Sequence, residues 1–353
     1  MGLDTEDRST TWTSIRDAVS GQPITDAIAI GTGGDHACAI RDDTSVWCWG
    51  RNNHGHLGNS STTDSAVAVQ VTMLSNSMPL LGAVTVGAGR DHTCAITSSS
   101  GVWCWGLNDV GQLGDGSAAP EQHQAVAVQS SAGGALGGVT EISVGRDHTC
   151  ATTANDEVWC WGANDYGQLA NDSPMGFHAT AVAIGTWRSV AAGQPDYTCM
   201  VDSANHAWCA GSSFRQRLGN GAHTTEEAIP ERYATPQPVL AAHDGTQLGE
   251  VAKAVAGSAS CALMIDHTVR CWGSNNHGQV GTGIGTGYPL PVIFQDGTPL
   301  TDVVELTAGY SHTCARTSAG ALLCWGRGTD GELADGSLTE HGFPTPITAP
   351  SCP

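Results

Sequence analysis

An all-β fold made of six repeated, four-stranded antiparallel units is predicted by three features of this 353-residue sequence. Twelve of its 13 cysteines form six pairs, with nine residues between the two members of each pair. The first cysteines of consecutive pairs are 56, 56, 49, 62 and 53 residues apart, so one unit recurs six times. Around each pair apolar residues alternate, and turn-forming Gly, Asn, Asp and Ser recur at short intervals, which is typical of short antiparallel strands. Four strands in each of six such units predict a single β-propeller, in which radial closure leaves little strand edge exposed.

The predicted propeller occupies residues 28–353 and follows an N-terminal segment, residues 1–27. Its repeat motifs are expected at residues 28–60, 84–118, 142–172, 190–221, 253–285 and 304–338. Outer strands are expected between the motifs, at Ala125–Gln129, Pro238–Leu240 and Pro291–Phe294. Thr13–Asp17 resembles these segments and is expected to be a closing outer strand, and residues 343–350, around Pro344–Thr348, are expected to form a C-terminal one. Six hairpins favour six blades, while a seventh, rudimentary blade formed by the two ends stays open.

The composition argues against nucleic acid and anionic membranes as partners. The chain has 34 acidic and 14 basic residues, which gives a net charge of −20, and this charge repels phosphate backbones. No apolar run approaches the roughly 18 residues of a membrane-spanning helix. The N-terminus is polar and shows no signal peptide.

Each cysteine pair is predicted to be a disulfide across one hairpin. In a hairpin centred on residue 43, Cys38 and Cys48 lie opposite each other, at a separation of about 4.5 Å that a disulfide spans. The six predicted bridges are Cys38–Cys48, Cys94–Cys104, Cys150–Cys160, Cys199–Cys209, Cys261–Cys271 and Cys314–Cys324. Zinc sites, which usually have closer cysteine spacing, and reduced structural cysteines are the alternatives. Paired cysteines indicate an oxidising compartment, so the protein is expected to be extracellular, periplasmic or on the cell surface, with its leader absent from this chain. Cys352 has no partner in this scheme, and its role stays open.

The amino-acid sequence around the cysteine pairs also repeats. The repeated motif is Gly-x-x-His-Thr-Cys-Ala followed by Trp-x-Trp-Gly-x-Asn-x-x-Gly-Gln-Leu-Gly. This string resembles the repeat of the regulator of chromosome condensation family, and the resemblance covers roughly Ile28 to Pro353. Repeat four departs from it with Tyr197 for the His and Ala210 for the Trp, and repeat five departs from it with Ser260 for the His. The resemblance implies a β-propeller, and familiar members of the family have seven blades.

Three recurring residue types suggest roles. The Trp residues of the Trp-Cys-Trp-Gly strings, such as Trp47 and Trp49, are expected to fill the core between blades. The recurring His residues are expected to be structural and to bond the backbone of a neighbouring loop, with a ring of metal ligands or bases as the alternative; they are His36, His92, His148 and His312. Asp35, Asp91 and Asp147 precede three of these His residues and are candidates to bind a cation or a basic protein surface, with a solvated rim as the alternative.

Repeat four is the most divergent repeat, and a long insertion, Ala222–Gln237, follows it. This insertion is predicted to belong to a binding surface, through residues Thr224, Glu226, Glu227, Glu231 and Arg232. The sequence contains no G-x-S-x-G, P-loop or H-E-x-x-H motif, so no catalytic residue, cofactor or metal is predicted.

These observations predict a non-catalytic, secreted or cell-surface interaction module that binds a protein or another macromolecule through its loop faces. One alternative, implied by the family resemblance, is a guanine-nucleotide-exchange regulator of a small GTPase. The basic tail that would touch DNA is missing from this sequence. The second alternative is an enzyme that uses the Asp and His ring at the mouth of the propeller.

Overall fold

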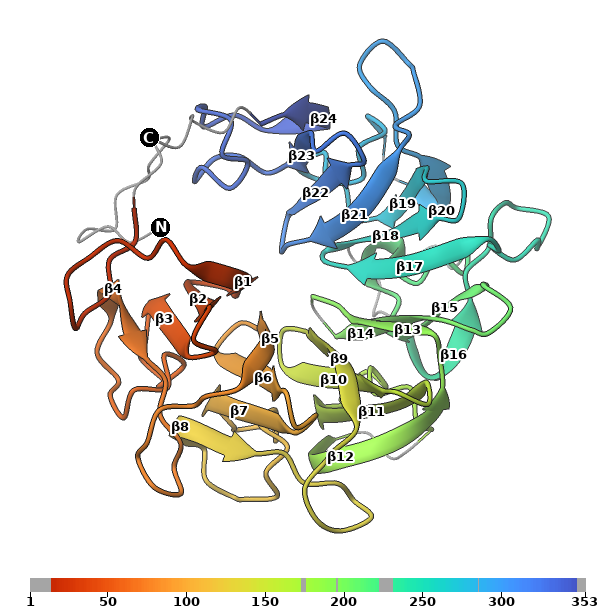
Figure 1. Ribbon diagram of the computed structural model, residues 1–353. Helices are drawn as coiled ribbons and strands as arrows, with labels where there is room; N and C mark the ends of the chain where they lie inside the picture. The colour runs from red at the N-terminus through yellow and green to blue at the C-terminus, as the bar shows by residue number, and fades with distance from the viewer. Residues whose placement is uncertain (1–13, 173–175, 195, 222–230, 285, 348–353) are drawn as a thin grey trace. The chain divides into compact units, whose positions relative to one another are not determined.

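The computed structural model describes residues 14–172, 176–194, 196–221, 231–284 and 286–347. They form 24 β-strands and one short 3-10 turn, η1 (Phe214–Gln216). The strands make six four-stranded antiparallel sheets, the six blades of an all-β propeller, as the sequence predicts. In these residues no helix has the length and apolarity needed to cross a bilayer. The chain divides into two compact units with three blades each (Figure 1).

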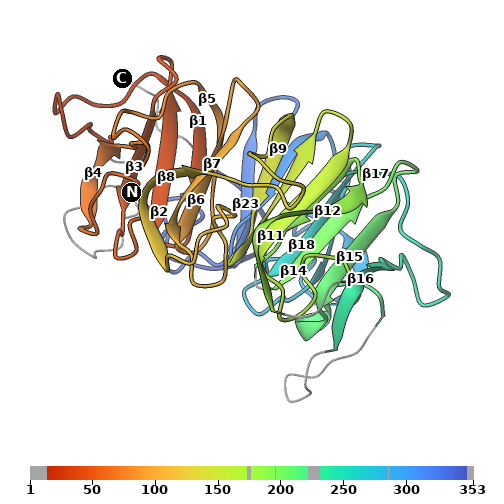
Figure 2. The ribbon, with the colours of Figure 1, turned by 90° about the horizontal axis from the view of Figure 1, so that it is seen from below.

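Unit 1 contains blades 1 to 3. Blade 1 consists of β1 (Ala27–Thr32), β2 (His36–Arg41), β3 (Val46–Gly50) and β4 (Ser65–Gln70). Blade 2 consists of β5 (Ala83–Ala88), β6 (His92–Thr97), β7 (Val102–Leu107) and β8 (Glu121–Ala127). Blade 3 consists of β9 (Val139–Val144), β10 (His148–Thr153), β11 (Glu157–Ala163) and β12 (Phe177–Thr186). Blades 1 and 2 lie side by side in both views (Figures 1 and 2).

Unit 2 contains blades 4 to 6. Blade 4 consists of β13 (Ser189–Ala192), β14 (Tyr197–Val201), β15 (Ala207–Ser212) and β16 (Arg232–Pro238). Blade 5 consists of β17 (Val251–Ala256), β18 (Ala259–Met264), β19 (Val269–Gly273) and β20 (Thr286–Pro291). Blade 6 consists of β21 (Val303–Ala308), β22 (His312–Thr317), β23 (Leu322–Gly326) and β24 (His341–Pro346).

The two middle strands of every blade are held in the register that the cysteine spacing predicts. Cys38 lies opposite Cys48 between β2 and β3, and the other five pairs are opposed in the same way. All six pairs are bridged, with Cα–Cα distances of 4.0–4.1 Å. This is the close approach of a pair whose peptide groups do not bond each other. The peptide groups of each second cysteine therefore point towards the outer strand.

The core lies between blades rather than inside a single sheet. The disulfide of blade 1 packs in one apolar cluster with Trp105 of blade 2, and the disulfide of blade 2 packs with Trp161 of blade 3. In unit 2, Trp272 and Trp325 meet the disulfide faces of blades 4 and 5 in the same manner. All four indole rings are fully buried. The predicted role as core between blades is confirmed for these four Trp residues, whereas Trp47 and Trp49 pack within blade 1 and against the N-terminal segment.

The outer strands begin several residues earlier than predicted. β8, β16 and β20 begin at Glu121, Arg232 and Thr286, whereas the expected segments cover only their last residues and the turns that follow. The early part of each outer strand has few aliphatic residues, and each strand pairs around a bulge next to the Gly that follows Trp105, Ala210 or Trp272. A strand with one open edge and a bulge carries little periodic apolar signal.

The N-terminal segment covers blade 1 instead of forming a regular strand. From Ser14 onward, the expected closing strand appears as single bridges, Arg16 with Pro23 and Asp17 with Ala68 of β4. Ile15 and Ile24 pack against the cluster that contains Trp47 and Trp49. At the other end, the expected outer strand corresponds to β24, and residues 348–350 lie outside the described part of the chain.

Candidate functional site

A hydrogen-bonded junction recurs between neighbouring blades. In unit 1 the backbone carbonyl of His56 accepts hydrogen bonds from Thr93 Oγ1 (3.1 Å) and from Trp105 Nε1 (2.9 Å) of blade 2. In unit 2 the carbonyl of Gln279 accepts from Thr313 Oγ1 and Trp325 Nε1 of blade 6, both at 3.0 Å. One loop carbonyl thus fixes two side chains of the following blade.

Two of the recurring His residues, His36 and His92, belong to this junction. His36 Nε2 lies 2.7 Å from Thr93 Oγ1, and His92 Nε2 lies 2.9 Å from Thr149 Oγ1. For these two residues the prediction that the His bonds the backbone of a neighbouring loop was wrong about the partner, which is a threonine hydroxyl of the next blade. Because Thr93 gives its only hydrogen to the His56 carbonyl, it must accept from His36, so His36 carries its proton on Nε2.

Burial keeps these imidazoles neutral. Desolvation holds the pKa of His36 well below its usual range, and His56 and His92 lower it further. Burial also lowers the pKa of His92 to about 3 and that of His148 to about 4. Nδ1 of His36 and of His92 is buried without a hydrogen-bond partner in the described chain. A neutral, solvent-excluded imidazole is poorly placed to serve as a general base for an incoming substrate.

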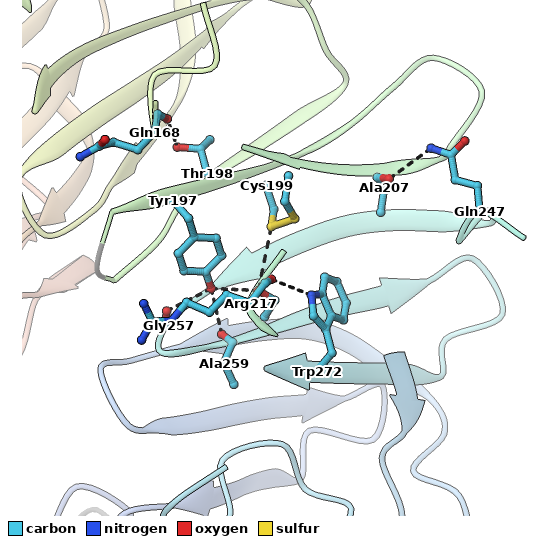
Figure 3. The surroundings of a disulfide bond; sticks show 12 residues. Gln168, Tyr197, Thr198, Cys199, Ala207, Arg217, Gln247, Gly257, Ala259 and Trp272 are labelled. Atoms are coloured by element: carbon cyan, nitrogen blue, oxygen red, sulfur yellow. Dashed lines mark hydrogen bonds between the residues drawn. A yellow bond between two sulfur atoms is a disulfide. The ribbon is translucent and has the colours of Figure 1, made fainter. Parts of the chain in front are cut away.

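The junction between blades 4 and 5 is a variant of the same arrangement (Figure 3). Tyr197 stands at the His position, and its hydroxyl lies 3.0 Å from the Gly257 carbonyl and 2.9 Å from Ser260 Oγ. Ser260 Oγ also lies 2.8 Å from the carbonyl of Arg217, which accepts from Trp272 Nε1 at 2.7 Å. Burial raises the pKa of Tyr197 to about 12, so the phenol stays protonated.

The strand register corrects the alignment of repeat five. Ala259 pairs with Gly273 as His36 pairs with Gly50, so Ala259 occupies the His position. Ser260 occupies the position of Thr93 in repeat two. The larger Tyr197 therefore reaches a serine where, in repeats one and two, a histidine reaches a threonine.

The three aspartates proposed as a binding ring are neutralised by arginines of the same chain. Asp35 pairs with Arg51 at 3.2 Å. Arg90 bridges Asp91 (2.6 Å) and Asp147 (3.1 Å), and Arg146 also lies 3.2 Å from Asp147. The Arg90 and Arg146 side chains are 38% and 34% exposed, whereas Asp91 and Asp147 are 16% and 18% exposed. At blades 2 and 3 the guanidinium groups therefore form the outer layer.

The predicted insertion is only partly visible. Thr224, Glu226 and Glu227 lie outside the described residues. Glu231 and Arg232 are exposed at the start of β16, where the Glu231 carbonyl accepts a hydrogen bond from the Ser213 amide (3.0 Å). The Arg232 guanidinium lies 4.8 Å from the centre of the Tyr166 ring.

A rim contact between blades was missed at the sequence level. The third residue of the Asn-x-x-Gly turn faces the start of the next blade's outer strand, as His54 faces Glu121 (3.3 Å) and His277 faces Glu340 (2.6 Å). Tyr166 and Arg232 are the corresponding pair in repeats three and four. The Asn-Asn-His-Gly string shared by repeats one and five was the available signal.

The recurring polar side chains are placed to hold neighbouring blades together rather than to form a catalytic centre. Across the described ranges, no group of three or more His, Cys, Asp or Glu residues is placed to hold a metal ion. The recurring His, Thr and Trp side chains are used to join blades, and the recurring Asp side chains are paired with Arg.

Comparison with known families identifies the repeat. The regulator of chromosome condensation (RCC1) repeat matches residues 27–55, 83–112, 139–168, 257–279 and 303–332 in one description, and residues 43–96 and 99–152 in a second. Together the matches span more than half of the chain. The chain belongs to the RCC1-repeat family.

Curated relatives of this RCC1-repeat chain differ greatly in length. The ultraviolet-B receptor UVR8 of Arabidopsis thaliana is 28% identical over 343 residues, which cover 94% of this chain and 71% of the receptor. The human E3 ubiquitin-protein ligase HERC2 is 29% identical over 308 residues, which cover 82% of this chain but 6% of the ligase.

Solved structures support the fold. Human WBSCR16 superposes with a TM-score of 0.75 at 23% identity, over 92% of this chain and 82% of that one. Yeast RCC1 (Prp20), solved with Kap60, superposes with a TM-score of 0.68 at 18% identity, over 92% of this chain and 75% of that one. At these identities the likeness concerns the fold alone.

Proposed function

We propose that this RCC1-repeat chain is a non-catalytic interaction module that binds a protein through its loop faces, outside the reducing cytosol. The observation that carries this proposal is the set of six disulfides, one in each blade at the same register. Disulfides persist in oxidising compartments, which favours an extracellular, periplasmic or surface location. They also hold rigid blades on which loops can vary, and loops on rigid scaffolds commonly carry binding.

The use of the recurring polar residues supports binding over catalysis. An enzyme at the mouth of the propeller would need accessible His and Asp side chains, whereas His36 and His92 are buried and neutral. Asp91 and Asp147 lie beneath arginines. The exchange-factor alternative has the fold likeness to yeast RCC1 (Prp20) in its favour, and Prp20 of Saccharomyces cerevisiae binds Gsp1p and histones. We expect this chain to leave nucleotide exchange on a small GTPase at the background rate.

Intact mass spectrometry tests the oxidising compartment. Protein purified in its native state, without reductant, should be lighter than the reduced chain by 12 hydrogens, two for each of the six bridges. A native mass equal to the reduced mass would contradict the proposed location.

Loop deletion tests the binding face. Deleting Thr224–Ile229 spares Glu231 and Arg232, which pair at the start of β16, so the melting temperature should hardly change. Capture of the partner from the secreted proteins of the source organism should weaken. The E226Q/E227Q variant keeps the loop length and so separates its charge from its length. Equal capture by wild type and deletion would show that the insertion is not part of the binding face.

Duplex DNA provides a test of partner class. With a net charge of −20, the chain should not retard DNA in an electrophoretic mobility assay even at low salt, because it has no basic stripe to displace counterions. Salt-sensitive retardation would argue for the chromatin-docking alternative.

A further inference from the structure

Connecting segment 71–82, which follows the outer strand of blade 1, exposes three large apolar side chains. Leu74, Met78 and Leu81 are 49%, 58% and 56% exposed, and the segment contains no charged residue. Its backbone is held in place, since the Leu74 amide donates a 3.0 Å hydrogen bond to the Ala125 carbonyl of blade 2. The three side chains are therefore presented to solvent from a fixed support.

The fold does not require apolar side chains at these three positions. Four other segments in the described residues follow the same course, because an aliphatic residue at the end of each turn bonds back to its start, as the Leu80 amide bonds the Val71 carbonyl at 2.9 Å. The residues aligned with Leu80 are Ile24, Leu136, Leu248 and Leu300. In this alignment small or polar residues stand for Leu74 (Ala18, Ser131, Ala242, Gln295), for Met78 (Gln22, Gly134, Thr246, Thr298) and for Leu81 (Thr25, Gly137, Gly249, Thr301).

Leu80 shows what the fold itself needs from this segment. Its side chain is 1% exposed and packs in the apolar cluster between blades 1 and 2, and an aliphatic residue takes its place in every equivalent segment. The apolar character of Leu74, Met78 and Leu81 is additional to this need and occurs in one segment alone of the five described. Grouped apolar side chains that face solvent mark an interaction surface in a protein of this kind.

The surface beside the segment is acidic. The Gly82 amide bonds Thr44 Oγ1 at the tip of the β2–β3 hairpin (2.9 Å), so the two turns lie side by side. Asp42 and Asp43 are exposed at this tip, and the neighbouring Arg41 is already paired with two other carboxylates. Basic side chains next to apolar ones would complement both features. The net charge of −20 also favours the approach of such a partner.

We propose that connecting segment 71–82 docks a partner protein through a stretch that combines large apolar side chains with lysine or arginine. The proposal rests on the proposed function and adds the chemistry of the partner to it. The partner's apolar side chains cover Leu74, Met78 and Leu81 and supply most of the affinity. Its basic side chains meet Asp42 and Asp43 and give the association its orientation and its dependence on salt.

A synthetic amphipathic peptide of leucine and lysine with helical spacing serves as the probe, and its affinity is measured by fluorescence anisotropy. The L74S/M78T/L81T variant carries residues that the other segments have at these positions, so it should melt like wild type. Its affinity for the peptide should fall at least about tenfold. Asp42→Asn should weaken binding several-fold at low salt and little at high salt. Asp156→Asn, which removes an exposed carboxylate from the hairpin tip of blade 3, is the matched control and should bind like wild type.

Two peptide results would overturn the proposal. One is equal binding of the peptide by wild type and by the folded triple variant. The other is equally tight binding of a peptide in which glutamate replaces lysine, because charge would then play no part. Leu74→Ser and Met78→Thr are measured singly as well, so the test does not depend on the triple variant folding.

Other occupants give different results. Sedimentation velocity that shows wild type self-associating and the triple variant monomeric would identify a second copy of this chain and overturn the proposal. Binding of phosphatidylcholine vesicles by wild type alone would assign the segment to a lipid surface instead. A natural partner that wild type and the triple variant capture equally would overturn this inference and leave the proposed function intact, whereas capture of no protein by wild type would count against the proposed function itself.

Discussion

His56 is the residue at which repeat one departs most clearly from its neighbours. Its side chain is 1% exposed, and both ring nitrogens are buried without a hydrogen bond of good geometry in the described structure, although the Arg51 backbone lies near enough to act on the ring. The equivalent Gln112 accepts a bond from the Val110 amide (3.0 Å) and donates one to Asp109 (3.0 Å). An unsatisfied buried polar group costs about 1–3 kcal/mol. The imidazole at this position is therefore a local weakness of blade 1.

We predict that His56→Gln stabilises the protein. The side-chain oxygen of the new glutamine should accept a hydrogen bond from the His54 amide, as the side-chain oxygen of Gln279 accepts one from the His277 amide at 2.9 Å. The free energy of unfolding in urea should rise by roughly 1 kcal/mol. The reciprocal Gln112→His serves as the control and should lose a similar amount, and a decrease for both variants would contradict this explanation.

At the scale of elements, blades meet through a glycine and a tryptophan. Gly114 has φ +66°, and a Cβ at this position would lie 2.7 Å from Trp161 Cδ1 of blade 3. Gly58, Gly219 and Gly281 meet the Trp of the following blade in the same way. Repeat three has Ala170 at this position, with φ +56°, and repeat four has Ala210 where the Trp would stand. The extra methyl group occurs where the indole is absent, so the two positions depend on each other.

A double-mutant cycle measures this dependence. Gly114→Ala should cost roughly 2–4 kcal/mol of unfolding free energy, because it combines backbone strain with overpacking against the indole. In a Trp161→Ala background the same change should cost only about 1 kcal/mol of strain. Additive effects of the two substitutions would show that Gly114 does not act through Trp161.

The sequence predicted the hairpins better than the strands around them, and the reason is physical. A disulfide demands one register, so cysteine spacing alone located β2 with β3 and every equivalent pair. The outer strands carry polar residues and prolines, such as Arg232 and Pro236 in β16, and this pattern resembles a loop. Counting back from Cys261 would have placed Ala259 at the His position. Arg90 bridges Asp91 and Asp147 because blades 2 and 3 bring these side chains together. This distance between blades cannot be read from the spacing of residues along one chain.

At the scale of the whole molecule, the buried histidines make stability depend on pH. The pKa of His148 is lowered to about 4 and that of His92 to about 3 in the folded protein, in both cases by burial. Unfolded imidazoles titrate near pH 6.5, so below that pH the unfolded chain binds more protons and stability falls. Each of the two residues should remove roughly 2 kcal/mol by about pH 5.

Urea unfolding between about pH 8 and pH 5 checks this expectation. The midpoint should fall as the pH is lowered, and His92→Gln should reduce the slope by the contribution of one proton. His36 and His312 have pKa values lowered by burial and should add to the decline. A midpoint that stays constant over this range would mean that these imidazoles accept protons inside the folded protein.

The six disulfides in the described part of the chain are all local, since each joins residues ten positions apart within one repeat. Twelve cysteines permit on the order of ten thousand complete pairings, but here the correct partner is always the nearest one along the chain. Each bridge therefore becomes possible as soon as its own hairpin has formed in an oxidising environment, without any contribution from later repeats. Because each disulfide lies within one repeat, duplication of a repeat within the gene also leaves the pairing unchanged. A copied repeat brings its own crosslink, so the number of repeats can change without any existing bridge having to find a new partner.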